Sequence, residues 1–196
     1  MLYDKDIREP LFDFLDEQYH VNRILEEKQM GRSRADVVMI TPEAVYGFEI
    51  KSDADTYARL ERQVRDYNLF YDYNYIVIGT SHALHVQNHV PAWWGIITVE
   101  LENGQPDFYI LRKPQKNPKV KWKRKLGILW RPELAHIQEI NGMPKYKQKS
   151  KDFVIDKIIE KIPEEILQYQ MCEELMQRDY NEIANVIAKY KEERNS

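Results

Sequence analysis

The chain has 196 residues, of which 43% are apolar and 31% are charged, a composition typical of a globular domain rather than of a disordered or fibrous chain. No apolar run approaches the roughly 18–20 residues that a membrane-spanning helix needs, and the single cysteine, Cys172, excludes an internal disulfide and a cysteine-rich zinc site. The net charge of −3 argues against binding to nucleic acid through overall charge alone. We therefore expect a cytoplasmic protein with no secretory signal and no membrane partner.

The first thirty residues predict a helix and then a strand. Apolar residues recur near helical spacing over residues 6–19, where Pro10 is tolerable only in the first helical turn. Residues 21–30 favour an exposed or edge strand, because they include consecutive charged side chains. A turn is expected at residues 31–33.

Two apolar runs, residues 35–40 and 45–51, predict neighbouring strands with chemical groups at their ends. A turn between the runs would form a hairpin that brings Asp36 close to Glu49. Residues two apart in a strand project from the same face, so Glu49 and Lys51 should point the same way. Two carboxylates and one ammonium group at a sheet edge make a candidate site for Mg²⁺ and phosphate.

A helix and further strands are predicted after the second run. Five apolar residues recur at steps of three and four, as in a helix that packs on a sheet: Tyr57, Leu60, Val64, Tyr67 and Tyr71. Charged residues between them, such as Arg59 and Arg62, would face solvent or a ligand. The continuous apolar run at residues 75–79 predicts a strand buried on both faces, and with it a βαβ crossover. The remaining elements predicted here are a short helix over residues 80–90 and strands over residues 95–100 and 107–111.

A basic segment separates this part of the chain from a helical part. Residues 112–125 carry many basic side chains and no acid. The segment suits contact with a phosphate backbone, although a solvated, charged hairpin explains it equally well. Beyond it, helices are predicted over residues 132–140, 152–162 and 163–191, with Pro163 interrupting the helical pattern.

The order of an aspartate and then a Glu-x-Lys triplet resembles the PD-(D/E)xK nuclease superfamily, which has the restriction-endonuclease-like fold. The residues that carry this resemblance are Asp36, Glu49, Ile50 and Lys51. Gln63 and Tyr67 are similar to the Gln-x-x-x-Tyr element of the RecB-type branch of that superfamily. Ala35 stands where the name-giving motif has proline, a departure that leaves the acid in place.

In more detail, the chain resembles the sce-type family of small bacterial and phage proteins over nearly its full length. The segments that carry this resemblance are residues 9–12, 31–36, 47–53 and 129–134. The implied fold is α/β, a restriction-endonuclease-like mixed central sheet flanked by helices. The implied domains are a nuclease-like core (1–111), a basic segment (112–130) and a mostly helical C-terminal extension packed on the core (131–196).

The activity that this resemblance implies is metal-dependent hydrolysis of phosphodiester bonds, with DNA as the expected substrate. Asp36 and Glu49 would bind Mg²⁺ or Mn²⁺, with the Ile50 carbonyl as a further ligand, because hard cations prefer oxygen. Lys51 would position the attacking water and offset charge on the phosphate oxygens. Glu9 either completes the metal shell or complements the dipole of the first helix.

Other side chains are candidates for contact with nucleic acid. Gln63 would join the catalytic group by orienting the substrate or the Lys51 region, unless it is merely solvated, and Tyr67 is either core, a nucleic-acid contact, or both. Arg32 and Arg34 would pair with phosphate or with nearby acids. The candidates from the basic segment are Lys121, Lys123 and Arg124.

His82, His85 and His89 share helical spacing, but the sequence offers them no fixed acid or cysteine partner, so we expect no zinc site.

The alternative function is a non-catalytic nucleic-acid-binding or adaptor protein that keeps the nuclease fold, because function resides in the site rather than in the fold. Many members of the superfamily cut as dimers, so a homodimer is also considered.

Overall fold

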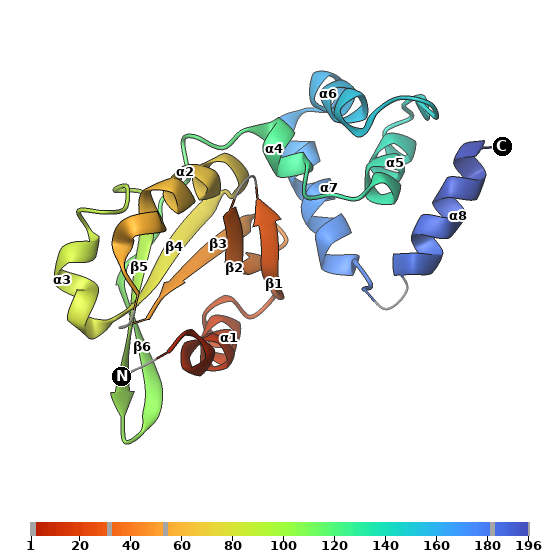
Figure 1. Ribbon diagram of the computed structural model, residues 1–196. Coiled ribbons are helices and arrows are strands. Elements are labelled where there is room, and N and C mark those ends of the chain that lie inside the picture. Colours follow the sequence, from red (N-terminus) through yellow and green to blue (C-terminus); the bar gives the residue numbers. More distant parts are fainter. Residues whose placement is uncertain (1–2, 31–32, 53–54, 181–182, 196) are drawn as a thin grey trace. The chain divides into compact units, whose positions relative to one another are not determined.

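A computed structural model describes residues 3–30, 33–52, 55–180 and 183–195 of the chain (Figure 1). The chain divides into two compact units, residues 1–120 and residues 121–196. The first unit contains a mixed sheet with helices and the second is helical. The predicted α/β class with a mostly helical C-terminal part is thus confirmed. Among the helices formed by the described residues, none has the length and apolar character needed to cross a bilayer.

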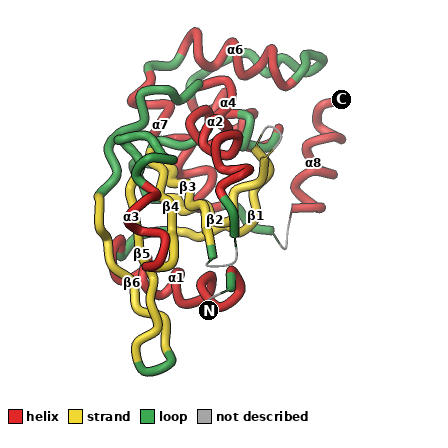
Figure 2. The backbone as a smooth tube through the Cα atoms, turned by 60° about the vertical axis from the view of Figure 1, so that its left-hand side comes forward, coloured by secondary structure: helices red, strands yellow, loops and turns green. Residues whose placement is uncertain are grey.

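Six strands form one sheet in sequence order, seen as the yellow strands of Figure 2. The strands are β1 (Arg23–Met30), β2 (Ser33–Ile40), β3 (Val45–Lys51), β4 (Tyr73–Gly79), β5 (Gly95–Glu102) and β6 (Gln105–Arg112). The neighbours β3, β4 and β5 run parallel, and the other neighbouring pairs are antiparallel. All the predicted strands are therefore present, and β1 lies at the sheet edge as expected.

Two main helices pack on this sheet from opposite sides (Figure 1). The helices of the first unit are α1 (Asp4–Tyr19), η1 (Tyr57–Arg59), α2 (Leu60–Phe70), η2 (Thr80–His82) and α3 (Ala83–Val86). α1 begins earlier than predicted, so Pro10 lies inside the helix rather than in its first turn. Proline removes one helical hydrogen bond there, and the burial of Ile7, Leu11 and Leu15 against the sheet offsets that loss.

The alternation of side chains along each strand separates an apolar face from the face that carries the charged groups. Val37, Met39, Phe48 and Ile50 point into the core beneath α1. Their neighbours in sequence project from the opposite face, where α2 packs and where Glu49 lies. This pleat is why a charged residue can stand between two core residues of β3.

α2 approaches β3 closely because position 47 has no side chain. A Cβ atom added at Gly47 would lie 2.3 Å from Cδ2 of Tyr71 and 2.8 Å from Cδ1 of Tyr67, well inside van der Waals contact. Both rings are fully buried. Glycine at this position therefore sets how near α2 can lie to the strand.

The second unit consists of helices that bury an ion pair. They are α4 (Trp122–Leu126), α5 (Arg131–Ile140), α6 (Lys151–Lys161), α7 (Glu164–Gln177) and α8 (Ile183–Asn195). α5 and α6 lie close to predicted helices, whereas the single helix predicted over residues 163–191 is divided into α7 and α8, and α4 was not predicted. The guanidinium of Arg178 donates two hydrogen bonds of 2.6 Å to Glu133 and lies 3.8 Å from the ring centroid of Trp130. Both charged side chains are almost inaccessible to solvent, so the pair links the end of α7 to the start of α5.

Candidate functional site

The strands β2 and β3 separate at the end where the two predicted acids lie. The last residues paired between these strands are Val37 and Phe48, whereas β3 continues to pair with β4 as far as Lys51. Continuing the register places Asp36 opposite Glu49, on the face that α2 covers. The hairpin thus brings both carboxylates to one gap between strands, as the sequence predicted.

The side chain of Asp36 closes this gap, because it takes the place of a backbone acceptor in the hydrogen bonding between β2 and β3. Its Oδ2 atom accepts the N–H of Ile50 at 2.9 Å. In an extended strand the N–H and C=O of one residue point to the same side, so the Ile50 carbonyl also faces the gap. Arg8 of α1 donates a hydrogen bond of 3.4 Å to the backbone carbonyl of Asp36, and its guanidinium lies 4.0 Å from Oδ1 of the Asp36 side chain. Arg8 also forms an ion pair of 2.7 Å with Asp4. The Asp36 side chain is 24% exposed.

Glu49 is a buried carboxylate with one oxygen satisfied and one not. Its Oε1 atom accepts hydrogen bonds of 2.5 Å from Nζ of Lys51 and from Nε2 of Gln63. Its Oε2 atom is buried and accepts no hydrogen bond of normal geometry from the described residues. Buried carboxylate oxygens are costly unless they are paired or bound to a cation, so this oxygen marks a position suited to a cation or a protein-bound proton.

The environment of the two acids favours their protonated forms. Burial, and to a lesser degree the charge of Asp36, raise the pKa of Glu49 to about 7, although Lys51 opposes both effects. Burial also raises the pKa of Asp36, while the hydrogen bond from Ile50 lowers it. Near neutral pH, Glu49 therefore exchanges a proton readily, and a bound cation would compete with that proton.

Tyr67 supports the gap from beneath rather than facing the solvent. Its hydroxyl donates to the Phe48 carbonyl at 2.8 Å and accepts the N–H of Asp36 at 3.3 Å, so it bridges β2 and β3 where their ladder ends. The side chain is fully buried. The structure thus places Tyr67 in the core, the first of its expected roles, and offers no surface there for direct contact with nucleic acid.

A cavity of about 400 Å³ opens over these groups. Lining residues from the strands are Arg34, Asp36, Glu49, Ile50 and Lys51. Those from the helices and the segment after β3 are Asp4, Asp55, Arg59, Arg62 and Gln63. The core of the predicted site is therefore gathered in one polar cavity, together with acids and arginines that the sequence did not single out as a site.

Glu9 and Arg32 differ from the predicted site residues that line the cavity. Glu9 is exposed and does not line the cavity; its neighbours on α1, Asp4 and Arg8, reach the site instead. Arg32 lies outside the described residues. Successive side chains of a helix point in directions that differ by about 100°. Glu9 therefore points away from the cavity although it is next to Arg8 in the sequence.

The candidates from the basic segment belong to the second unit. Lys121, Lys123 and Arg124 are all exposed. Lys123 pairs with Asp156 at 2.8 Å, and the adjacent Lys125 is buried, with its ammonium 4.5 Å from the ring centroid of Trp122. Part of the basic charge is thus used inside this unit, and the role of the exposed residues in binding nucleic acid stays a prediction.

The histidines fit an aromatic cluster better than a metal site. The ring centroid of Tyr57 lies 4.2 Å from that of His89 and 5.7 Å from that of His82. Across the described parts of the chain, no group of three or more His, Cys, Asp or Glu side chains is placed to hold a metal ion. Asp36 and Glu49 form a pair of carboxylates, so a cation here would also need the Ile50 carbonyl or water.

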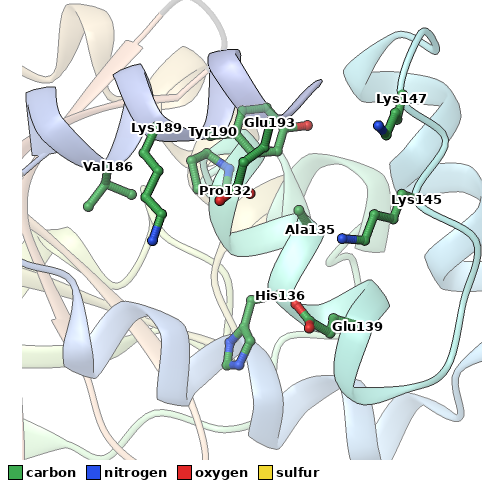
Figure 3. Close-up of a pocket in the computed structure, with 10 residues that line it drawn as sticks. All are labelled: Pro132, Ala135, His136, Glu139, Lys145, Lys147, Val186, Lys189, Tyr190 and Glu193. Atoms are coloured by element: carbon green, nitrogen blue, oxygen red, sulfur yellow. The ribbon is translucent and has the colours of Figure 1, made fainter. Parts of the chain in front are cut away.

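A second cavity, of about 750 Å³, lies in the C-terminal unit between α5 and α8 (Figure 3). Lys189, Tyr190 and Glu193 approach it from one helix, and His136 and Glu139 from another. Its charged lining residues are exposed, and His136 is paired with Glu174 at 2.5 Å. The smaller cavity is the better candidate because it alone of the two contains buried ionisable groups, Glu49 and Lys51.

Comparison with known proteins gives a matching family and, among the solved structures, a distant match. The family model described as Bacteriophage P4 protein cII matches residues 1–196, whereas the motifs led us to expect the sce-type family. A solved structure of SfsA from Pyrococcus furiosus, in complex with Ca²⁺, is 13% identical with a TM-score of 0.34. The match covers 57% of this chain and 60% of SfsA, less than two thirds of that protein. None of the curated proteins matched the chain.

Proposed function

The chain belongs to the bacteriophage P4 protein cII family, and we propose that it is a metal-dependent nuclease of the PD-(D/E)xK type. The observation that carries this proposal is the Glu49 carboxylate, which is buried, has one oxygen without a hydrogen-bond partner among the described residues, and shares its cavity with Asp36 and Lys51. A purely structural carboxylate would be expected to have both oxygens satisfied.

The residues present suit a hard divalent cation. Oδ1 of Asp36, Oε2 of Glu49 and the Ile50 carbonyl are oxygen donors, the class that Mg²⁺ and Mn²⁺ prefer. When bound, such a cation supplies a Lewis acid that promotes ionisation of water and offsets charge on phosphate oxygens. The Ile50 N–H holds Oδ2 of Asp36, which leaves Oδ1, 4.0 Å from the Arg8 guanidinium, as the oxygen that would bind the cation.

The protein's own side chains would then orient the reacting groups. The Lys51 ammonium, held 2.5 Å from Glu49, has further N–H groups that would hold the attacking water and contact a phosphate oxygen. Gln63 donates to the same Glu49 oxygen, so it fixes the carboxylate's rotation. Tyr67 keeps the two strands at a constant separation beneath them.

A cleavage assay tests this function. Labelled single-stranded, duplex and branched DNA, and RNA, would be incubated with the protein in Mg²⁺, Mn²⁺ or EDTA. We expect cutting that requires a divalent cation and is lost in Lys51→Met, which removes the ammonium but keeps most of the side-chain volume. Arg65→Gln is the matched control, because Arg65 is exposed, pairs with Glu61 and does not line the cavity.

The outcomes separate enzyme from adaptor. Cutting that persists in Lys51→Met would place the activity elsewhere or in a contaminant. Binding without cutting on every substrate and with either cation would favour the non-catalytic nucleic-acid-binding or adaptor protein. DNA is the expected substrate, and the RNA arm of the assay tests that expectation.

A further inference from the structure

Two arginines line the cavity beside the acids and are presented by one helical turn. Arg59 ends η1 and Arg62 lies in the first turn of α2, three residues apart and next to Gln63. Residues at this spacing share one side of a helix. Both side chains are exposed, so their guanidinium groups are accessible to a ligand that enters the cavity.

The acids of the cavity already have partners, and these arginines do not. Asp4 pairs with Arg8, Glu49 pairs with Lys51, and Asp55 accepts hydrogen bonds from the backbone and hydroxyl of Ser52. Asp36 accepts the N–H of Ile50. Within the described residues, neither Arg59 nor Arg62 forms an ion pair or a side-chain hydrogen bond.

Arg65 shows what a structural arginine on the same helix looks like. It forms an ion pair of 2.6 Å with Glu61 and does not line the cavity. The contrast between paired Arg65 and the unpaired Arg59 and Arg62 is therefore tied to position: the unpaired charges are the ones beside the candidate catalytic group. Lacking an internal counter-ion, they suit an external anion.

We infer that Arg59 and Arg62, here called the arginine pair, are positioning residues that bind the phosphate backbone of a nucleic-acid strand and hold it against Glu49 and Lys51. The inference rests on the proposed function for its substrate. Guanidinium groups bind phosphate oxygens through two parallel hydrogen bonds, which fixes orientation as well as distance. The pair also lies at the start of α2, where the helix dipole adds favourable potential for an anion.

The size of the effect follows from counterion release. Each phosphate contact contributes about 0.7 to 0.9 to the slope of log affinity against log salt concentration. Removing one contact should lower that slope by about one and, near 0.1 M salt, weaken binding by about tenfold. A solvated arginine with no contact would change neither quantity by this amount.

The experiment measures binding apart from cleavage. Fluorescence anisotropy of labelled single-stranded DNA, duplex DNA and RNA oligonucleotides would be recorded in EDTA over a range of salt concentrations. The full-length proteins are wild type, Arg59→Gln, Arg62→Gln, and Arg65→Gln as the matched control. Circular dichroism would verify that each variant folds, which we expect because all three side chains are exposed.

We expect each change in the arginine pair to weaken binding about tenfold and to lower the salt slope by about one, with Arg65→Gln unchanged. Wild-type affinity and slope in both Arg59→Gln and Arg62→Gln would overturn the inference, as would equal losses in all three variants or no binding by the wild type. If the pair is needed for binding but wild type does not cut in Mg²⁺, the inference stands and the proposed nuclease function fails. If wild type cuts in Mg²⁺ and the variants bind normally, the proposed nuclease function stands and the inference about the arginine pair fails.

Discussion

Replacing Glu49 with glutamine should change how the stability of the protein depends on pH. The carboxyl group is almost completely buried, and its pKa is raised from 4.5 to about 7, chiefly by burial. Between these values the folded protein keeps a proton on Glu49 that the unfolded chain has released. The free energy of unfolding must therefore fall as the pH rises through this window.

The magnitude follows from the two pKa values. The difference between 4.5 and 7, at about 1.4 kcal/mol for each pH unit, corresponds to about 3.5 kcal/mol. This contribution is fully present below about pH 4.5 and is lost above about pH 7. Glutamine at this position stays neutral, so the variant should lack this loss.

Urea denaturation in EDTA measures the effect, with Trp93 and Trp94 as fluorescent reporters in the first unit. We expect wild type to lose about 2.5 kcal/mol more than Glu49→Gln between about pH 5 and about pH 8. Identical pH profiles for the two proteins would refute the reasoning, because they would mean that Glu49 ionises in the folded protein as freely as in the unfolded chain.

Three further effects are expected. Tyr67→Phe removes the hydroxyl that bridges Asp36 to the neighbouring strand, and should cost about 1–3 kcal/mol in urea denaturation while slowing any cleavage. Arg178→Met leaves buried Glu133 without its cation, and should lower stability by about 3–5 kcal/mol, seen as earlier thermal unfolding. Mg²⁺ binding should release close to one proton from Glu49 at about pH 6 and almost none at about pH 8, measured by calorimetry in buffers of different ionisation enthalpy.

Each of these has a clear contrary result. Wild-type stability in Tyr67→Phe would mean that water replaces the bridge. An unchanged melting curve for Arg178→Met would mean that the Glu133 carboxyl becomes solvated or protonated without cost. Proton release that does not vary with pH would show that the cation binds without displacing a proton from Glu49.

The strands and the main helices could be predicted from sequence because their signals are local. The apolar runs that became β2, β3 and β4 and the stripe that became α2 are patterns of adjacent residues, and burial of one face fixes their type. Pro10 shows the limit of such patterns. Local chemistry disfavours it inside a helix, but packing of α1 on the sheet outweighs that preference.

The candidate site was predictable only where its residues share a strand or a hairpin. Glu49 and Lys51 are fixed by the two-residue period of β3, and Asp36 by the register of the hairpin. The contact between Arg8 and Asp36 joins residues 28 positions apart, and no periodic pattern predicts it. The raised pKa of Glu49 is likewise a property of the packed site, since it depends chiefly on burial.

The charge of the basic segment was visible in the sequence, but the partners of that charge were not. Lys123 is paired with Asp156, thirty-three positions later in the chain. Lys125 is buried under Trp122. The number of basic residues in a segment therefore gives the amount of positive charge, but it does not show how much of that charge is accessible to a ligand.

Gly47 has a consequence for how a mutational scan of this protein would look. Any side chain at this position must displace the rings of Tyr67 and Tyr71, and α2 would move with them. Gln63 is carried by the same helix and holds Glu49 through a hydrogen bond of 2.5 Å, so the candidate catalytic carboxylate would lose its orientation. Sensitivity to substitution should therefore extend to a residue that has no functional group and does not line the cavity, and its pattern along β3 should include Gly47 together with Glu49 and Lys51.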